Sequence, residues 1–188
     1  MGSIMKIIET SIPGLKIFKP TIFEDTRGKF IKTFNDDFFK EQSLNINIKE
    51  TYYSISHKDV IRGMHFQTPP FDHIKLVYVP HGKIIDVILD IRKNSPTFGQ
   101  YFSCELSDEN RKILIIPKGL AHGFKSLKDN TNVTYMQTTC YAANNDGGVK
   151  YDSFGFDWQC NSPKLSQRDE SFKNLNEFNS PFIFEEIL

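Results

Sequence analysis

The pattern that decides the fold class lies in the stretch KIIDVILDI, residues 83–91. Successive side chains of an extended chain point to opposite faces. This stretch therefore places Asp86 and Asp90 among isoleucines on one face and, after Lys83, only aliphatic side chains on the other. An aspartate on such a strand must be paired or must border a polar cavity. The alternation predicts a buried strand whose inner face is partly polar.

Short apolar segments of the same kind recur along the chain, and clusters such as TPP at 68–70 and PHG at 80–82 separate them. Strands at intervals of about ten residues are typical of a β-sandwich or barrel. The chain lacks the strand-helix alternation that would build a parallel sheet. We therefore expect an all-β fold. Its further strands are expected at residues 29–34, 46–56, 74–79, 99–106, 112–116 and 132–141.

Helix is expected only in short pieces. One piece covers residues 36–42, and another begins after Ser166, because Ser166 and Asp169 have the spacing of a capping box. On this pattern alone, a helix-capping role is a sufficient explanation for the Asp169 carboxylate.

The composition fits one domain, residues 1–188, with residues 1–4 as a remnant of cloning. Apolar residues make up 39% of the chain, and its longest aliphatic run, residues 113–116, is far too short to cross a membrane. Lys and Arg (23) balance Asp and Glu (23), so no overall field favours nucleic acid or an anionic membrane. Three cysteines without CxxC spacing and no visible targeting segment favour a reducing, cytoplasmic location.

Two stretches place cationic side chains in strand patterns. In RGMHFQ, residues 62–67, Arg62 and His65 are three apart and would point to opposite faces unless the glycine introduces a bulge. Taken alone, the pair is better explained as a surface arginine and a hydrogen-bonded core histidine. Lys75 lies among apolar neighbours, and an inward lysine would need an anion. An outward, solvated Lys75 is the simpler alternative.

A sharper signal is PKGLAHGF, residues 117–124, where a proline and two glycines predict a tight corner that aims His122. The spacing resembles the second conserved motif of the cupins, which are small jelly-roll barrels. The first cupin motif, His-x-His, is missing, because Phe66 and Gln67 follow His65. A metal site of His65, His73 and His122 remains an alternative that we do not favour. Core packing is a sufficient explanation for Tyr135 and Tyr141.

In order along the chain, these motifs resemble those of the nucleotide-sugar 4-keto epimerases typified by dTDP-4-dehydrorhamnose 3,5-epimerase. The resemblance is colinear and covers nearly the whole chain. It rests on residues 23–28, 62–67, 75–77, 86–87, 90–92, 95–99, 116–124, 135–141, 157–158 and 162–169.

The resemblance implies a cupin-type jelly roll, usually a homodimer, that works without metal or cofactor and inverts stereocentres beside a C4 ketone. Such chemistry needs a base, a donor to the enolate oxygen and an acid on the opposite face. By position, His65 is the expected base and Asp169 its orienting partner. Lys75 is the expected enolate stabiliser, and Tyr135 is the expected acid.

The resemblance also implies a binding site for a nucleoside diphosphate sugar carrying dTDP or GDP. Arg27 and Arg62 would bind the diphosphate. His122 would lie beside the sugar, and the other expected binding residues are Gln67, Glu50 and Tyr141.

The chain departs from the family pattern at Lys32, where an acidic residue is common, and in one longer segment. Where the family usually reads Gln-x-Asn-His-Ser, this chain has ETYYS at residues 50–54. Because Glu50 and Tyr52 replace smaller, neutral amides, we expect one dominant inversion, at C3, on a 4-keto deoxysugar or heptose. The alternatives are a cupin ketoisomerase, which moves the carbonyl, and a sugar-binding cupin without activity. The expected catalytic residues favour an enzyme, because a protein that only binds sugar does not need a base and an acid together.

Overall fold

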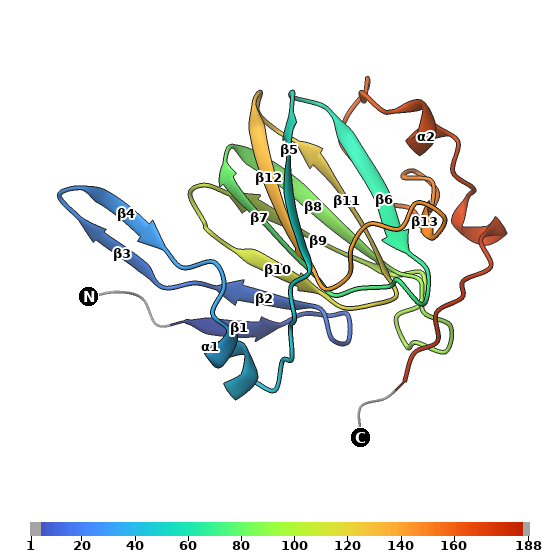
Figure 1. Ribbon diagram of the computed structural model, residues 1–188. Helices are drawn as coiled ribbons and strands as arrows, with labels where there is room; N and C mark the ends of the chain where they lie inside the picture. Colours follow the sequence, from blue (N-terminus) through green and yellow to red (C-terminus); the bar gives the residue numbers. More distant parts are fainter. Residues whose placement is uncertain (1–4, 186–188) are drawn as a thin grey trace.

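The computed structural model describes residues 5–185 and shows two packed antiparallel sheets with a small separate hairpin (Figure 1). The proposed cloning remnant, residues 1–4, lies outside the described residues. One sheet has the strand order β1-β2-β10-β7-β12-β5. Its strands are β1 (Lys6–Glu9), β2 (Lys16–Lys19), β10 (Ile113–Ile116), β7 (Lys75–His81), β12 (Thr131–Gln137) and β5 (Glu50–Ser56).

The second sheet faces the first and has the order β13-β6-β11-β8-β9. Its strands are β13 (Asp146–Gly148), β6 (Ile61–Gln67), β11 (Leu120–Ser126), β8 (Lys83–Asp90) and β9 (Tyr101–Ser107). This two-sheet jelly roll confirms the expected all-β fold. Among the described residues, no helix is long and apolar enough to span a membrane.

The alternating stretch at 83–91 forms strand β8, which confirms the prediction. Ile84 and Ile88 belong to the core between the sheets. Val87 and Leu89 pack on the other side, under the C-terminal segment that includes Trp158. Both faces of the strand are therefore buried, which explains its nearly continuous apolar sequence.

The two aspartates of β8 are fully buried and are used differently. Asp90 accepts hydrogen bonds from Arg92, Ser95 and Thr97, with the Arg92 Nη2 atom 2.7 Å from Asp90 Oδ2. Asp86 bonds to His122 beside a cavity. Asp90 is therefore a structural carboxylate, whereas Asp86 lies at the polar end of the barrel.

The two α-helices are short, as expected. Helix α1 (Asp36–Glu41) is capped by Asn35 and packs Phe39 against the outer face of the first sheet. Helix α2 (Gln167–Glu170) is capped by Ser166, which accepts from the Asp169 N–H. The structure adds a 3₁₀ turn, η1 (Leu175–Glu177), that the sequence pattern does not predict.

The hairpin of β3 (Ile22–Asp25) and β4 (Gly28–Ile31) projects from the barrel (Figure 1). The expected strand at 29–34 is part of it and is shorter than predicted. Its Phe23 and Phe30 side chains are 52% and 61% exposed. The hairpin therefore presents apolar surface away from the core.

Other predicted boundaries also need correction. Residues 46–49 and 138–141 lie outside strands β5 and β12. The stretch 117–124 is not a corner throughout, because the chain turns at Lys118–Gly119 and enters β11, where His122 lies.

Gly123 misled the prediction at β11 because it serves a close approach of strands rather than a corner. A Cβ atom on Gly63 would lie 2.5 Å from Gly123 Cα, and a Cβ on Gly123 would lie 2.6 Å from Met64 Sδ. Only residues without a side chain allow β6 and β11 to meet this closely.

Candidate active site

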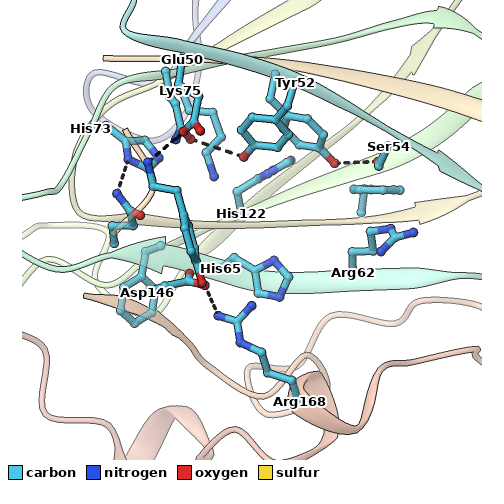
Figure 2. Close-up of a pocket in the computed structure, with 16 residues that line it drawn as sticks. Glu50, Tyr52, Ser54, Arg62, His65, His73, Lys75, His122, Asp146 and Arg168 are labelled. Carbon is cyan, nitrogen blue, oxygen red and sulfur yellow. Dashed lines mark hydrogen bonds and ion pairs between the residues drawn. The ribbon is translucent and has the colours of Figure 1, made fainter. Parts of the chain in front are cut away.

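A cavity of about 460 Å³ opens between the two sheets (Figure 2). Strands β5, β7 and β12 of one sheet and β6 and β11 of the other line it, together with β13 and α2. Its lining residues are Glu50, Tyr52, Ser54, Arg62, His65, Phe66, Gln67, His73, Lys75, His122, Phe124, Tyr135, Gln137, Tyr141, Asp146 and Arg168.

A β-bulge brings Arg62 and His65 to the same cavity. His65 pairs with His122 in the sheet, whereas Arg62 pairs with Phe124, so three steps on β6 match two on β11. This extra residue reverses the alternation that would otherwise send the two side chains to opposite faces. The glycine in RGMHFQ allows this bulge, but the strand pattern alone favours opposite faces for the two side chains.

His65 forms a hydrogen-bonded pair with Asp169. The His65 Nε2 atom lies 2.7 Å from Asp169 Oδ1, while Asp169 Oδ2 accepts from the Gly63 N–H at 3.3 Å. Burial alone would raise the pKa of Asp169, but hydrogen bonds, first of all that from His65, outweigh it and lower the pKa. The ionised carboxylate therefore holds the proton of the imidazole on Nε2 and leaves Nδ1 as the basic nitrogen.

The opposite sheet contributes Tyr135 and Lys75, and both side chains are buried. Burial raises the pKa of Tyr135, so its phenol stays protonated. Burial lowers the pKa of Lys75 from 10.5 to about 8, although the charges of Asp146 and Asp86 raise it. The cavity thus holds a phenol and a buried ammonium group across from the imidazole.

His122 forms a second imidazole–carboxylate pair at the inner end of the cavity. Its Nε2 atom lies 2.9 Å from Asp86 Oδ2, and Asp86 Oδ1 has no hydrogen-bond partner among residues 5–185. Burial lowers the pKa of His122, which keeps the imidazole neutral. The residue therefore presents a fixed, uncharged ring to the cavity.

The other expected binding residues, Gln67, Glu50 and Tyr141, also line the cavity. They form hydrogen bonds within the protein. Gln67 donates to Phe71 O at 2.9 Å and accepts from the Ala142 N–H at 2.7 Å. Glu50 accepts from the Tyr141 N–H at 2.9 Å. These contacts hold the loop after β12 over the cavity, where the Tyr141 side chain is 61% exposed.

Two guanidinium groups lie at the cavity. Arg62 donates to Ser56 Oγ at 3.2 Å, and Arg168 pairs with Asp146 at 2.7 Å (Figure 2). Arg27, which the resemblance assigned to the same task, lies on the projecting hairpin and pairs with Asp25. Within one chain, Arg27 is therefore not brought to the cavity.

Four polar lining residues are not predicted from the sequence: Arg168, Asp146, Ser54 and Gln137. The only signal for Arg168 is its place beside Asp169. The alternative of a three-histidine metal site is not supported by the geometry. Residues 5–185 contain no cluster of three or more His, Cys, Asp or Glu side chains suited to a metal. Instead His73, whose pKa burial lowers to about 3, contacts Thr139.

The fold and the cavity together define a class of protein, a cupin-type jelly-roll enzyme that transfers protons. An imidazole on one sheet faces a phenol and an ammonium group on the other, which are groups suited to acid–base catalysis at carbon. Comparison with known proteins shows the family to which the chain belongs. The family model described as dTDP-4-dehydrorhamnose 3,5-epimerase matches residues 9–177. The chain belongs to this family of isomerases, which confirms the resemblance.

Relatives and solved structures agree with this assignment. A dTDP-4-dehydrorhamnose 3,5-epimerase of Methanothermobacter thermautotrophicus is 39% identical over 177 residues, which are 92% of this chain and 95% of the relative. The Legionella pneumophila dTDP-6-deoxy-D-glucose-3,5-epimerase, solved with dTDP-4-keto-L-rhamnose, superposes with a TM-score of 0.91 at 35% identity. That match covers 96% of this chain and 100% of the other.

A further structure differs in its reported chemistry. It is a 3'-monoepimerase of Streptomyces bikiniensis, solved in complex with dTDP-quinovose. Its TM-score is 0.84 at 27% identity, and the match covers 89% of this chain and 86% of the other. The same fold therefore occurs in enzymes described as double and as single epimerases.

Proposed function

We propose that this protein inverts one or both stereocentres beside the C4 ketone of a dTDP-4-keto-6-deoxysugar. The observation that carries the proposal is the placement of His65, paired with Asp169, across the cavity from Tyr135. Base and acid on opposite sheets can act on opposite faces of a sugar between them, as inversion requires. Relatives solved with dTDP sugars support dTDP rather than GDP as the nucleotide of this substrate class.

In the proposed reaction, His65 Nδ1 takes the proton from C3 or C5, and the electron pair of that C–H bond forms the enolate with the C4 carbonyl. Protonated Lys75 donates to the enolate oxygen. Tyr135 then gives its phenolic proton to the same carbon from the other face, and the carbonyl reforms. His65 returns its proton to solvent and the Tyr135 phenolate regains one, so the cycle is balanced.

Binding of the nucleoside diphosphate is assigned to the cationic side of the cavity. Arg62 and Arg168 supply planar donors that match phosphate oxygens in pairs. His122 would contact the sugar, while Glu50, Gln67 and Tyr141 form the wall for the nucleoside. Arg27 joins this site only if the hairpin of a second copy reaches the cavity.

A homodimer is therefore part of the proposal. Support comes from the hairpin, which carries exposed Phe23 and Phe30 beside Arg27. Burying these rings against a second copy would remove apolar surface from water. We further propose that one domain carries all the chain's own site residues and that the enzyme acts in the cytoplasm, where its free cysteines would remain reduced.

The test is incubation with dTDP-4-keto-6-deoxyglucose in heavy water, followed by proton NMR and mass spectrometry. The proposal predicts inverted product with deuterium at each inverted carbon. A product whose carbonyl has moved to C3 would favour the ketoisomerase instead. Binding without exchange or product would favour the non-catalytic sugar-binding protein.

A further inference from the structure

The ring of Tyr52 lies stacked on the ring of Tyr135. The two residues are directly opposite in the pairing of β5 with β12. Their ring centroids are 4.7 Å apart and the ring planes differ by 18°. Figure 2 shows Tyr52 and Ser54 projecting from β5 on the same side of the cavity. The edge strand therefore covers one face of the proposed acid.

Tyr135 is held by other contacts as well. Its hydroxyl lies 3.3 Å from Ser54 Oγ. The ring of His122 meets it edge-on, at 6.1 Å between centroids and 68° between planes. With Tyr52 stacked on the face of the ring, the phenol has little freedom to swing across the cavity.

Tyr52 is itself anchored. Its hydroxyl donates to Gln137 Oε1 at 3.4 Å, and Gln137 Nε2 donates to Glu50 Oε2 at 2.6 Å. Gln137 therefore links the side chains of Tyr52 and Glu50. A chain of hydrogen bonds thus runs from Glu50 to Tyr52, whose ring stacks on Tyr135.

We infer that Tyr52 is a positioning residue that holds Tyr135 in one orientation and so directs its proton to a single carbon beside the C4 ketone, which is expected from the sequence to be C3. The inference rests on the proposed function. C3 and C5 lie on opposite sides of C4, so a fixed base and a fixed acid can serve both carbons only if the sugar turns or the acid moves. An amide at position 52 would leave one face of the Tyr135 ring uncovered.

The test separates exchange from inversion in heavy water with dTDP-4-keto-6-deoxyglucose. Exchange at C3 needs only His65, whereas inversion also needs correctly placed Tyr135. The measured quantity is the ratio of inverted to exchanged C3, together with the rate of deuterium uptake at C5 relative to C3. Damage to the fold alone would lower exchange and inversion together and leave these ratios unchanged.

Tyr52→Ala should lower the inversion-to-exchange ratio at C3 by about three- to ten-fold, the range expected for loss of one aromatic pair. It should also raise uptake at C5 relative to C3. Tyr52→Leu keeps a large apolar side chain but removes the ring, so it should change both ratios in the same way. It replaces the alanine variant in the test if that variant does not fold. Tyr52→Phe keeps the stack and should keep the ratios of the wild type.

The matched control is Tyr53→Ala, because Tyr53 is the next residue on β5 and its side chain is 64% exposed outside the cavity. It should leave both ratios unchanged. Wild-type ratios in both Tyr52→Ala and Tyr52→Leu would overturn the inference, as would a wild type that inverts C3 and C5 equally fast. A wild type that neither exchanges nor inverts would overturn the proposed function, and the inference with it.

Discussion

The Nε2 atom of His65 lies 2.7 Å from Oδ1 of Asp169, although the two residues are 104 positions apart in the chain. Asp169 comes from the short helix α2, whose N-cap Ser166 fixes the backbone at this point. The Gly63 N–H holds the second carboxylate oxygen. The orientation of the imidazole is therefore set from both the barrel and the C-terminal segment.

His65→Ala should abolish both epimerisation and exchange of substrate protons with solvent. Loss of a general base typically costs about a hundred- to ten-thousand-fold in rate. NMR in heavy water measures both processes at once. His81→Ala is the control, because His81 is exposed at the far end of β7 and lines no part of the cavity. Exchange at the wild-type rate in His65→Ala would assign the base elsewhere.

Tyr135→Phe should separate the two half-reactions. Without the phenolic hydroxyl, proton delivery on the second face should fall by roughly a hundred-fold or more. Removal and return of the proton by His65 should continue. Mass spectrometry should then find deuterium in substrate that has not been inverted. Normal epimerisation by the variant would remove Tyr135 from the mechanism.

Activity should be unchanged after prolonged dialysis against EDTA. The proposed base is His65 and the proposed donor to the enolate oxygen is Lys75, so no Lewis acid is required. Rates before and after dialysis, with metal content measured on the same samples, test this expectation. Loss of activity that a divalent ion restores would contradict it and revive the three-histidine alternative.

The regular parts of the barrel could be predicted because alternation alone determines them. Strand β8 shows this, since its pattern specifies both the strand and its two buried aspartates. The pattern could not say that Asp90 would bind Arg92 while Asp86 would reach His122, because those partners depend on loop and strand packing. Strand β11 was missed because the close approach of Gly123 to β6 leaves the same sequence signal as a turn.

The candidate site was predicted by resemblance more than by local pattern. Periodicity sends Arg62 and His65 to opposite faces, and only the bulge on β6 reunites them. Asp169 has a sufficient local explanation as a helix cap, and its contact with His65 depends on how the C-terminal segment crosses the barrel. The stack of Tyr52 on Tyr135 depends on strand register, which the residues of β5 alone do not specify.

Asp90→Ala should destabilise the protein without changing the cavity. The carboxylate accepts from Arg92, Ser95 and Thr97, and its loss leaves the buried Arg92 guanidinium without its counterion. Breaking a buried pair in this way costs about 3–5 kcal/mol. Urea unfolding followed by circular dichroism measures the change. Asp157→Ala, at an exposed position outside the helices and strands, is the control, and equal stability of the two variants would contradict the prediction.

The basic limb of the pH profile should report Lys75. Its pKa, lowered by burial from 10.5 to about 8, means that the ammonium form needed at the enolate oxygen is lost as pH rises through about 8. We therefore expect kcat/KM to fall above this pH. Lys75→Arg should lack this limb, even at reduced activity, because a guanidinium group stays charged throughout the range. A wild-type profile flat to pH 10 would contradict the assignment.

Loss of activity through Lys75 can be distinguished from unfolding at high pH, because the two depend on pH in opposite directions at this residue. Between about pH 8 and 10.5, the unfolded chain, in which Lys75 has its ordinary pKa, binds more protons at this residue than the folded protein. The contribution of Lys75 to stability must then rise with pH over the same window in which activity falls. Circular dichroism at each pH of the profile tests the distinction. A native spectrum at pH 9 with reduced kcat/KM assigns the limb to Lys75 chemistry, whereas parallel loss of both would assign it to unfolding.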